Sequence, residues 1–103
     1  MSEIQFRKLF VVEPSHDVSA TKKYTSQVVF ITSGEESIEE VQHKIEQNIK
    51  EFDPKLDAFI PMGRVTSCSI ALALIGRKIP KGESVMMGVY RNESYFFVPV
   101  VMR

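Results

Sequence analysis

One stretch in the middle of the chain constrains the fold most. Residues 56–62 form an apolar run, Gly63 follows it, and Thr66 and Ser67 precede an apolar segment over residues 70–75. A short apolar run that ends at a glycine is typical of a buried strand, and hydroxyl side chains favour the start of a helix. In α/β proteins, a strand that turns into a helix in this way is where anions and ligands bind. We therefore expect an α/β sheet that contains this strand–turn–helix unit.

The helix of this unit is expected to be capped by Thr66 or Ser67 and to end at Gly76 in the left-handed conformation. Two basic residues follow and complement the negative end of the helix dipole. Because the helix is apolar nearly all round, it should be buried on most sides or cover one side with a partner chain.

The segment before the unit predicts an amphipathic helix. Ser37 and Glu40 have the spacing of a capping box, and Pro54 ends the helix near Phe52. Apolar side chains follow one stripe at helical spacing: Ile38, Val41, Ile45, Ile49 and Phe52.

Two strands are predicted in the first third of the chain. Residues 4–12 are rich in β-branched and aromatic side chains, and Pro14 stops this strand. Residues 27–32 contain four consecutive apolar residues, which predicts a central strand buried on both faces. Between them, Asp17 either caps a short helix over residues 18–23 or lies in a loop that closes an antiparallel hairpin. That choice decides whether the first two strands are parallel.

The C-terminal quarter predicts an antiparallel hairpin. Residues 84–91 and 95–102 are predicted as strands joined around residues 92–94, and Pro99 places the last strand at a sheet edge. The hairpin is very apolar, which fits either a sheet core or a dimer interface.

Strands that alternate with helices predict a single α/β domain over residues 1–103. Its sheet is mainly parallel, with helices packed on it and the antiparallel hairpin at one edge. The alternative is an α+β sheet with an N-terminal hairpin, which resembles nucleic-acid-binding domains of the Alba type; those also have a Gly-Arg pair after a strand.

Composition excludes several classes of protein. Thirteen basic and thirteen acidic residues cancel, which argues against generic binding to duplex DNA. The single cysteine, Cys68, permits no intramolecular disulfide, and we expect neither a metal centre nor a cofactor. With no signal peptide and no apolar run of the roughly 18 residues that span a bilayer, we expect a cytoplasmic protein without membrane contact.

Several candidate ligand-binding residues gather at one edge, because the carboxyl ends of parallel strands share it. The helix start after Gly63 offers unpaired N–H groups, and Arg64 adds a fork of donors suited to a phosphate or carboxylate. The competing interpretation is a tight turn with Arg64 in solvent. The full set of candidates is Gly63, Arg64, Thr66, Ser67, His16, Ser33 and Gly34.

Other reactive side chains are less well placed. His16 and Asp17 could form an acid–base pair, but Asp17 also fits a helix cap. Cys68 fits a small buried residue better than a reactive thiol. Four acidic residues near strand ends do not converge as metal ligands should: Glu13, Glu35, Glu36 and Asp57. Three aromatic residues of the hairpin could stack on bases, although alternation turns half of such side chains inward: Tyr90, Tyr95 and Phe97.

Two resemblances follow from these motifs. Residues 9–13, Gly34 and the strand before Gly63 resemble a Toprim domain, which has a glutamate after its first strand, matched by Glu13, and an acidic pair after its third. This chain has Pro61 and Met62 in place of the pair, so the resemblance implies topology and not metal-dependent chemistry. The segments 16–19, 28–31 and 57–63 are similar to small uncharacterised proteins of phages and mobile elements, which imply no function.

Three functions are compatible with these patterns. The first is a non-enzymatic binding protein that holds a phosphate-bearing ligand, such as a nucleotide or nucleic acid, at the Gly63–Arg64 turn. The second is a phage-derived or accessory interaction protein that forms a homodimer through the second helix or the C-terminal hairpin. A small hydrolase that uses His16 and Asp17 ranks last, because no spacing specifies a nucleophile.

Overall fold

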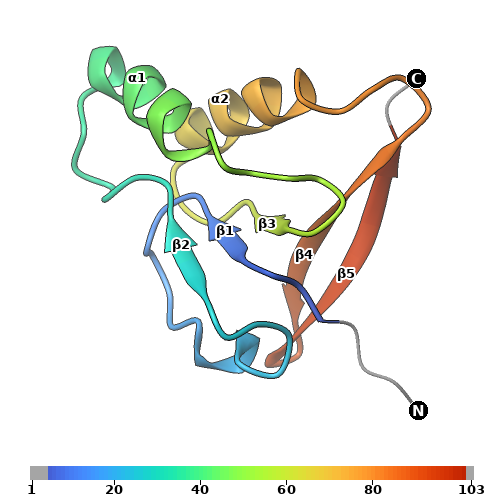
Figure 1. Cartoon of the computed structure of the whole chain (residues 1–103). Coiled ribbons are helices and arrows are strands. Elements are labelled where there is room, and N and C mark those ends of the chain that lie inside the picture. The colour runs from blue at the N-terminus through green and yellow to red at the C-terminus, as the bar shows by residue number, and fades with distance from the viewer. Residues whose placement is uncertain (1–4, 102–103) are drawn as a thin grey trace.

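The computed structural model describes residues 5–101 and shows a five-stranded sheet with two helices (Figure 1). The sheet has the order β2-β1-β3-β4-β5. Its strands are β1 (Leu9–Val11), β2 (Val28–Phe30), β3 (Ala58–Ile60), β4 (Ser84–Arg91) and β5 (Ser94–Val101), and its helices are α1 (Ile38–Asn48) and α2 (Val65–Gly76). The predicted limits at Ile4 and Met102 lie outside the described residues.

The strand directions confirm the predicted α/β class. The four strands β2, β1, β3 and β4 pair with one another in parallel, with Phe10 paired to Val29 on one side and to Phe59 on the other. β5 runs antiparallel to β4 and forms the edge hairpin. Because β1 and β2 are parallel, the N-terminal hairpin of the alternative α+β topology is wrong.

The prediction of β2 as a central strand is wrong. β2 lies at the edge of the sheet, and Phe30 is 41% exposed. The apolar run has another cause: Ile31, just after the strand, is fully buried in the core under the helices, while Val28 packs against the opposite face.

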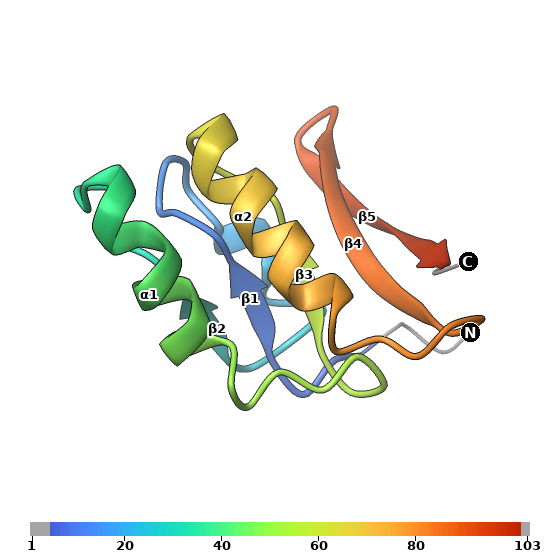
Figure 2. The same cartoon turned by 90° about the horizontal axis from the view of Figure 1, so that it is seen from above.

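Both helices cover the same face of the sheet (Figure 2). Right-handed crossovers from β2 to β3 and from β3 to β4 run in the same direction, which places α1 and α2 side by side. Between them and the sheet lies the main core, in which the rings of Phe10 and Phe52 meet edge to face at 5.1 Å. A second core on the other face is covered by residues 13–27 and by side chains of β5.

The start of α1 follows the prediction. Ser37 is the N-cap, and its side chain accepts the backbone N–H of Glu40. Of the predicted stripe, Ile38 is 66% exposed while the other four members are buried. The helix ends at Asn48, earlier than expected, although Phe52 still packs into the core.

The two ends of α2 differ from the prediction. Arg64 is the N-cap, and no side chain of the first turn caps the helix, so the proposed caps Thr66 and Ser67 are wrong. Gly76 is the last helical residue rather than a left-handed cap. One apolar side of the helix stays open, since Val65 is 81% and Leu72 is 42% exposed.

The connection from β1 to β2 contains one short 3₁₀ turn, Ser19–Thr21, so it is neither the helix over residues 18–23 nor the loop of an antiparallel hairpin. Asp17 accepts hydrogen bonds from the backbone N–H and the hydroxyl of Ser19 and so holds the start of this turn. Between residues 5 and 101, neither helix is long and apolar enough to cross a membrane.

Candidate functional site

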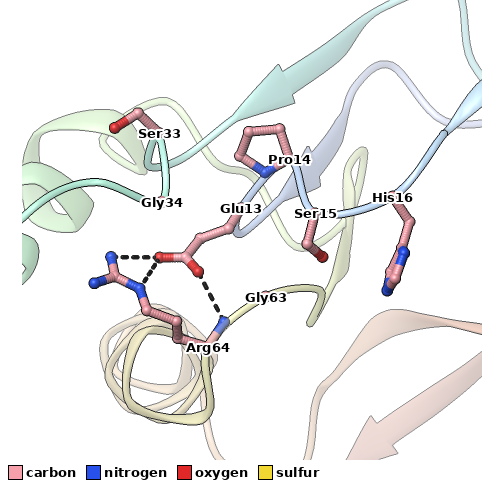
Figure 3. A pocket seen from close by; sticks show the side chains of 8 residues that line it. All are labelled: Glu13, Pro14, Ser15, His16, Ser33, Gly34, Gly63 and Arg64. Carbon is pink, nitrogen blue, oxygen red and sulfur yellow. Dashed lines mark hydrogen bonds and ion pairs between the residues drawn. The ribbon is translucent and has the colours of Figure 1, made fainter.

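A hollow of about 430 Å³ lies at the carboxyl ends of β1, β2 and β3 (Figure 3). β1 is the point at which the sheet order reverses, because the chain passes to β2 on one side and later to β3 on the other. Open α/β sheets bind ligands at such a point. The residues around the hollow are Glu13, Pro14, Ser15, His16, Ser33, Gly34, Gly63 and Arg64.

The structure therefore brings together five of the seven predicted site residues, namely His16, Ser33, Gly34, Gly63 and Arg64. The other two do not line the hollow, although Ser67 bonds to Glu13, which does. Thr66 is exposed on α2, and Ser67 is buried beneath it.

Glu13 is the central group of the site, and its side chain is almost fully buried. Its Oε1 accepts the backbone N–H of Arg64 at 2.7 Å, and its Oε2 accepts the Arg64 side chain at 2.9 Å from Nε and 2.7 Å from Nη2. The hydroxyls of Ser67 and Thr32 lie 2.6 and 3.1 Å from Oε2. Burial raises the pKa of Glu13, but the bonds from Arg64, Ser67 and Thr32 outweigh it and lower the pKa to about 2. The carboxylate is therefore ionised at neutral pH.

Arg64 is tied into the site rather than extended into solvent. Besides the two bonds to Glu13, its Nη1 donates to the backbone oxygen of Glu36 at 2.8 Å, and its Nη2 lies 3.9 Å from the Glu36 carboxylate. Even so, the Arg64 side chain is 41% exposed. We call the group Glu13, Arg64 and Ser67 the clamp, because it joins the end of β1 to the start of α2.

The loop after β2 holds a second carboxylate. Glu36 accepts the backbone N–H groups of Ser33 and Gly34 at 3.0 and 3.1 Å, which lowers the pKa of Glu36. Two places where backbone N–H groups converge, the start of α2 and this loop, are thus each occupied by a carboxylate of the chain itself.

Gly63 is required by the shape of the turn. Its φ is +119°, and a Cβ at this position would lie 2.5 Å from the Cβ of Glu13. A side chain there would push Glu13 out of the clamp, so Gly63 permits the close approach of the two segments.

The remaining candidates stay apart from the clamp. His16 is exposed and points away from Glu13 toward the C-terminal hairpin (Figure 3). Both carboxylate oxygens of Asp17 accept bonds from Ser19, but Val18 and not Asp17 is the N-cap of the 3₁₀ turn, so the prediction of Asp17 as a helix cap is wrong. Cys68 is half-buried, and burial raises its pKa, as expected for an unreactive thiol. In the part of the chain that the structure describes, no three side chains of His, Cys, Asp or Glu could hold a metal ion together.

Sequence reasoning missed how the charges pair. Glu13 and Arg64 are 51 residues apart, and the second buried acid, Asp57, pairs with Arg7 from a distance of 50 residues at the opposite end of the sheet. The only signals in the sequence were Glu13, close after the strand that became β1, and Asp57, directly before the strand that became β3. Comparison of the chain with protein-family models, curated proteins and solved structures gave no match. The inference about function therefore rests on the residues of the site.

Proposed function

We propose that this protein is a small non-enzymatic binding protein that holds a phosphate-bearing ligand, a nucleotide or nucleic acid, beside the Gly63–Arg64 turn. One observation carries the proposal: the hollow of about 430 Å³ at the reversal point of the sheet has a half-exposed arginine in its wall. Arginine presents five N–H donors in a fixed fork, and three of those of Arg64 are used within residues 5–101. Two donors remain for a phosphate oxygen.

The backbone beside Arg64 adds to this donor set. Within the described residues, the N–H groups of Val65 and Thr66 have no acceptor, as is usual in the first turn of a helix. Of the backbone N–H groups at this end of α2, Glu13 accepts only that of Arg64, and Val65 beside it is exposed, so a ligand can approach the remaining N–H groups, where the helix dipole favours negative charge.

The neighbouring carboxylates limit the affinity. Glu13 and Glu36 together carry two negative charges against the one positive charge of Arg64. A phosphate should therefore contact the open side of Arg64 and leave Glu13 in place. Since Glu36 is the nearer of the two to solvent, removing its charge should strengthen the binding of an anion.

Two opposed variants test the proposal. In calorimetric titrations with ribose 5-phosphate and the nucleoside 5′-monophosphates, Arg64→Lys should weaken binding, because a lysine lacks the flat fork of donors. Glu36→Gln should strengthen it, because a glutamine keeps an oxygen for the N–H groups of Ser33 and Gly34. Arg77→Ala, at the far end of α2, is the control. Equal binding by wild type and both site variants would refute the proposal.

A second candidate function is favoured by the open side of α2. Val65 and Leu72 are exposed there, next to a hollow of about 300 Å³ walled by apolar side chains that include Phe59 and Met87. This is the surface expected of an accessory protein that forms a homodimer. Sedimentation of wild type and Leu72→Glu tests it: a dimer that the variant abolishes supports this function, and a monomeric wild type at high concentration excludes it.

A further inference from the structure

A second hollow, beyond His16, has a different character from the first. It measures about 250 Å³ and is lined by His16, Asp17, Met62, Tyr90 and Tyr95. Three of these five side chains, His16, Tyr90 and Tyr95, have aromatic rings, and Met62 is a thioether. Such side chains pack well against the face of a flat ring. The volume is below the range of about 300–1,000 Å³ that holds whole drug-sized molecules, so one ring system fits better than a complete nucleotide.

Tyr95 leaves a polar group unsatisfied in this wall. Its side chain is 3% exposed, and its hydroxyl has no hydrogen-bond partner among residues 5–101. Buried hydroxyls almost always have a partner, so the Tyr95 hydroxyl offers a free donor to a ligand or a water molecule that enters this hollow. Burial, with Tyr90 and Asp17 nearby, raises the pKa of Tyr95 and keeps its hydroxyl protonated as a donor. Asp17 lines the same hollow, but its carboxylate accepts bonds from Ser19 and none from the Tyr95 hydroxyl.

Tyr90 supplies a movable wall. Its ring lies 4.9 Å from that of Tyr95, centre to centre, and is tilted by 58°. Because Tyr90 is 55% exposed, its ring can change orientation with little loss of packing. A ring bound there would stack on Tyr90, as bases stack on exposed aromatic side chains in other proteins.

The aromatic hollow and the hollow beside Arg64 are neighbours that share lining residues through a third hollow. A third hollow of about 280 Å³ shares Gly63 with the first and Met62 and Tyr90 with the second, and His16 lines all three. A ligand with a flat ring at one end and an anionic group at the other would thus find suitable partners at both ends.

We propose that the hollow of His16, Asp17, Met62, Tyr90 and Tyr95 binds the nucleobase of a mononucleotide, with the Tyr95 hydroxyl donating to a ring or carbonyl acceptor of the base. The proposal rests on the proposed function in one respect, since the phosphate of the same nucleotide is assigned to Arg64.

The test separates the two ends of the ligand. The full chain is titrated calorimetrically with adenosine, adenosine 5′-monophosphate, ribose 5-phosphate and the matching uracil compounds. Comparison of these affinities gives the contribution of the base and that of the phosphate separately. Two variants act on the ring alone. Tyr95→Phe removes only the unpartnered oxygen, so it should fold as well as wild type and bind nucleosides about 3- to 10-fold more weakly. Tyr90→Ala should weaken the same ligands roughly 5- to 100-fold. Phe96→Ala, at an exposed aromatic position of the same hairpin outside the hollow, is the matched control.

The outcomes distinguish this inference from the function on which it rests. Nucleoside binding that Tyr95→Phe and Tyr90→Ala weaken and Phe96→Ala leaves unchanged supports the aromatic subsite. If ribose 5-phosphate binds as tightly as the nucleotides, the phosphate function stands and the aromatic subsite is wrong. If nucleosides bind but the phosphate adds no affinity, the subsite stands and the assignment of phosphate to Arg64 fails. If no compound binds, both are refuted.

Discussion

Replacement of the buried carboxylate at Glu13 tests the energetics of the clamp most directly. Glutamate has an ordinary pKa of 4.5, and the clamp lowers that of Glu13 to about 2. At about 1.4 kcal/mol for each unit of pKa, this difference amounts to roughly 3 kcal/mol of folding free energy. Glu13→Gln keeps the shape of the side chain and removes the charge. At pH 7 we therefore expect it to lower the free energy of unfolding by about 3 kcal/mol, or the melting temperature by roughly 10–25 °C.

The pH dependence of the unfolding free energy tests more specifically whether this contribution of Glu13 is electrostatic. Because the pKa of Glu13 is lower in the folded chain than in the unfolded chain, protonation favours unfolding. The contribution is complete above about pH 5 and is lost as the pH falls from 4.5 toward 2, with about 2 kcal/mol gone by pH 3. The wild type should therefore lose this contribution to its stability as the pH falls, whereas Glu13→Gln has no such contribution to lose. The difference in unfolding free energy between the two should narrow from about 3 kcal/mol at pH 7 to about 1 kcal/mol at pH 3.

Urea unfolding at pH 7, 5, 4 and 3 measures this gap. Glu35→Gln is the control, because Glu35 is exposed and its carboxylate makes no hydrogen bond within residues 5–101; it should stay within about 0.5 kcal/mol of wild type. A gap between Glu13→Gln and wild type that is the same at pH 7 and pH 3 would refute the electrostatic reasoning, because the cost would then come from packing alone.

Three further predictions concern stability and can be measured by the same unfolding assay. Gly63→Ala should lower the free energy of unfolding by well over 1 kcal/mol, because the added Cβ would clash with Glu13. Gly82→Ala is the control: its φ is +89° and no atom lies within 4 Å of an added Cβ, so it should cost only about 1 kcal/mol of backbone strain. Equal losses in the two variants would contradict the clash. Asp57→Asn should cost about 1–3 kcal/mol, because the buried side chain loses its charge-assisted bonds to the Arg7 guanidinium, which is itself 43% exposed and stays hydrated; a loss below about 0.5 kcal/mol would show that this pair is not needed. Glu93→Gly should stabilise the chain by about 0.5–1 kcal/mol, since Glu93 has a φ of +65° in the two-residue hairpin turn; a destabilised variant would show that the Glu93 side chain contributes contacts of its own.

The parts of the fold that could be predicted are those that depend on residues close together in the sequence. The cap at Ser37, the spacing of Val41 and Ile45, and the turn between β4 and β5 each depend on residues close in sequence. The edge position of β2 could not be predicted in this way. The same apolar run fits a central strand with a neighbour on each side and an edge strand whose side chains are buried by other parts of the chain. Only the order of the strands in the sheet distinguishes these two positions.

The site was predicted in location but not in its charge pairing. The Gly63–Arg64 turn and the loop at Ser33–Gly34 do meet at the edge where parallel strands end. The partner of Arg64, however, is a glutamate from another strand 51 residues earlier, and no local pattern links the two. Tyr90 and Tyr95 were named as residues that could stack on bases, but the hollow that they form with His16 could not be predicted, because His16 and Tyr95 come from opposite ends of the chain.

The long separation between the members of the clamp also bears on the order of events in folding. The bonds from Glu13 to Arg64 and Ser67 close loops of 51 and 54 residues, so they form only after β1, β3 and α2 have come together. Interactions that form after the transition state leave the folding rate almost unchanged and slow the unfolding rate instead. We therefore expect Glu13→Gln to leave the folding rate almost unchanged and to raise the unfolding rate, so that the clamp lengthens the lifetime of the folded state.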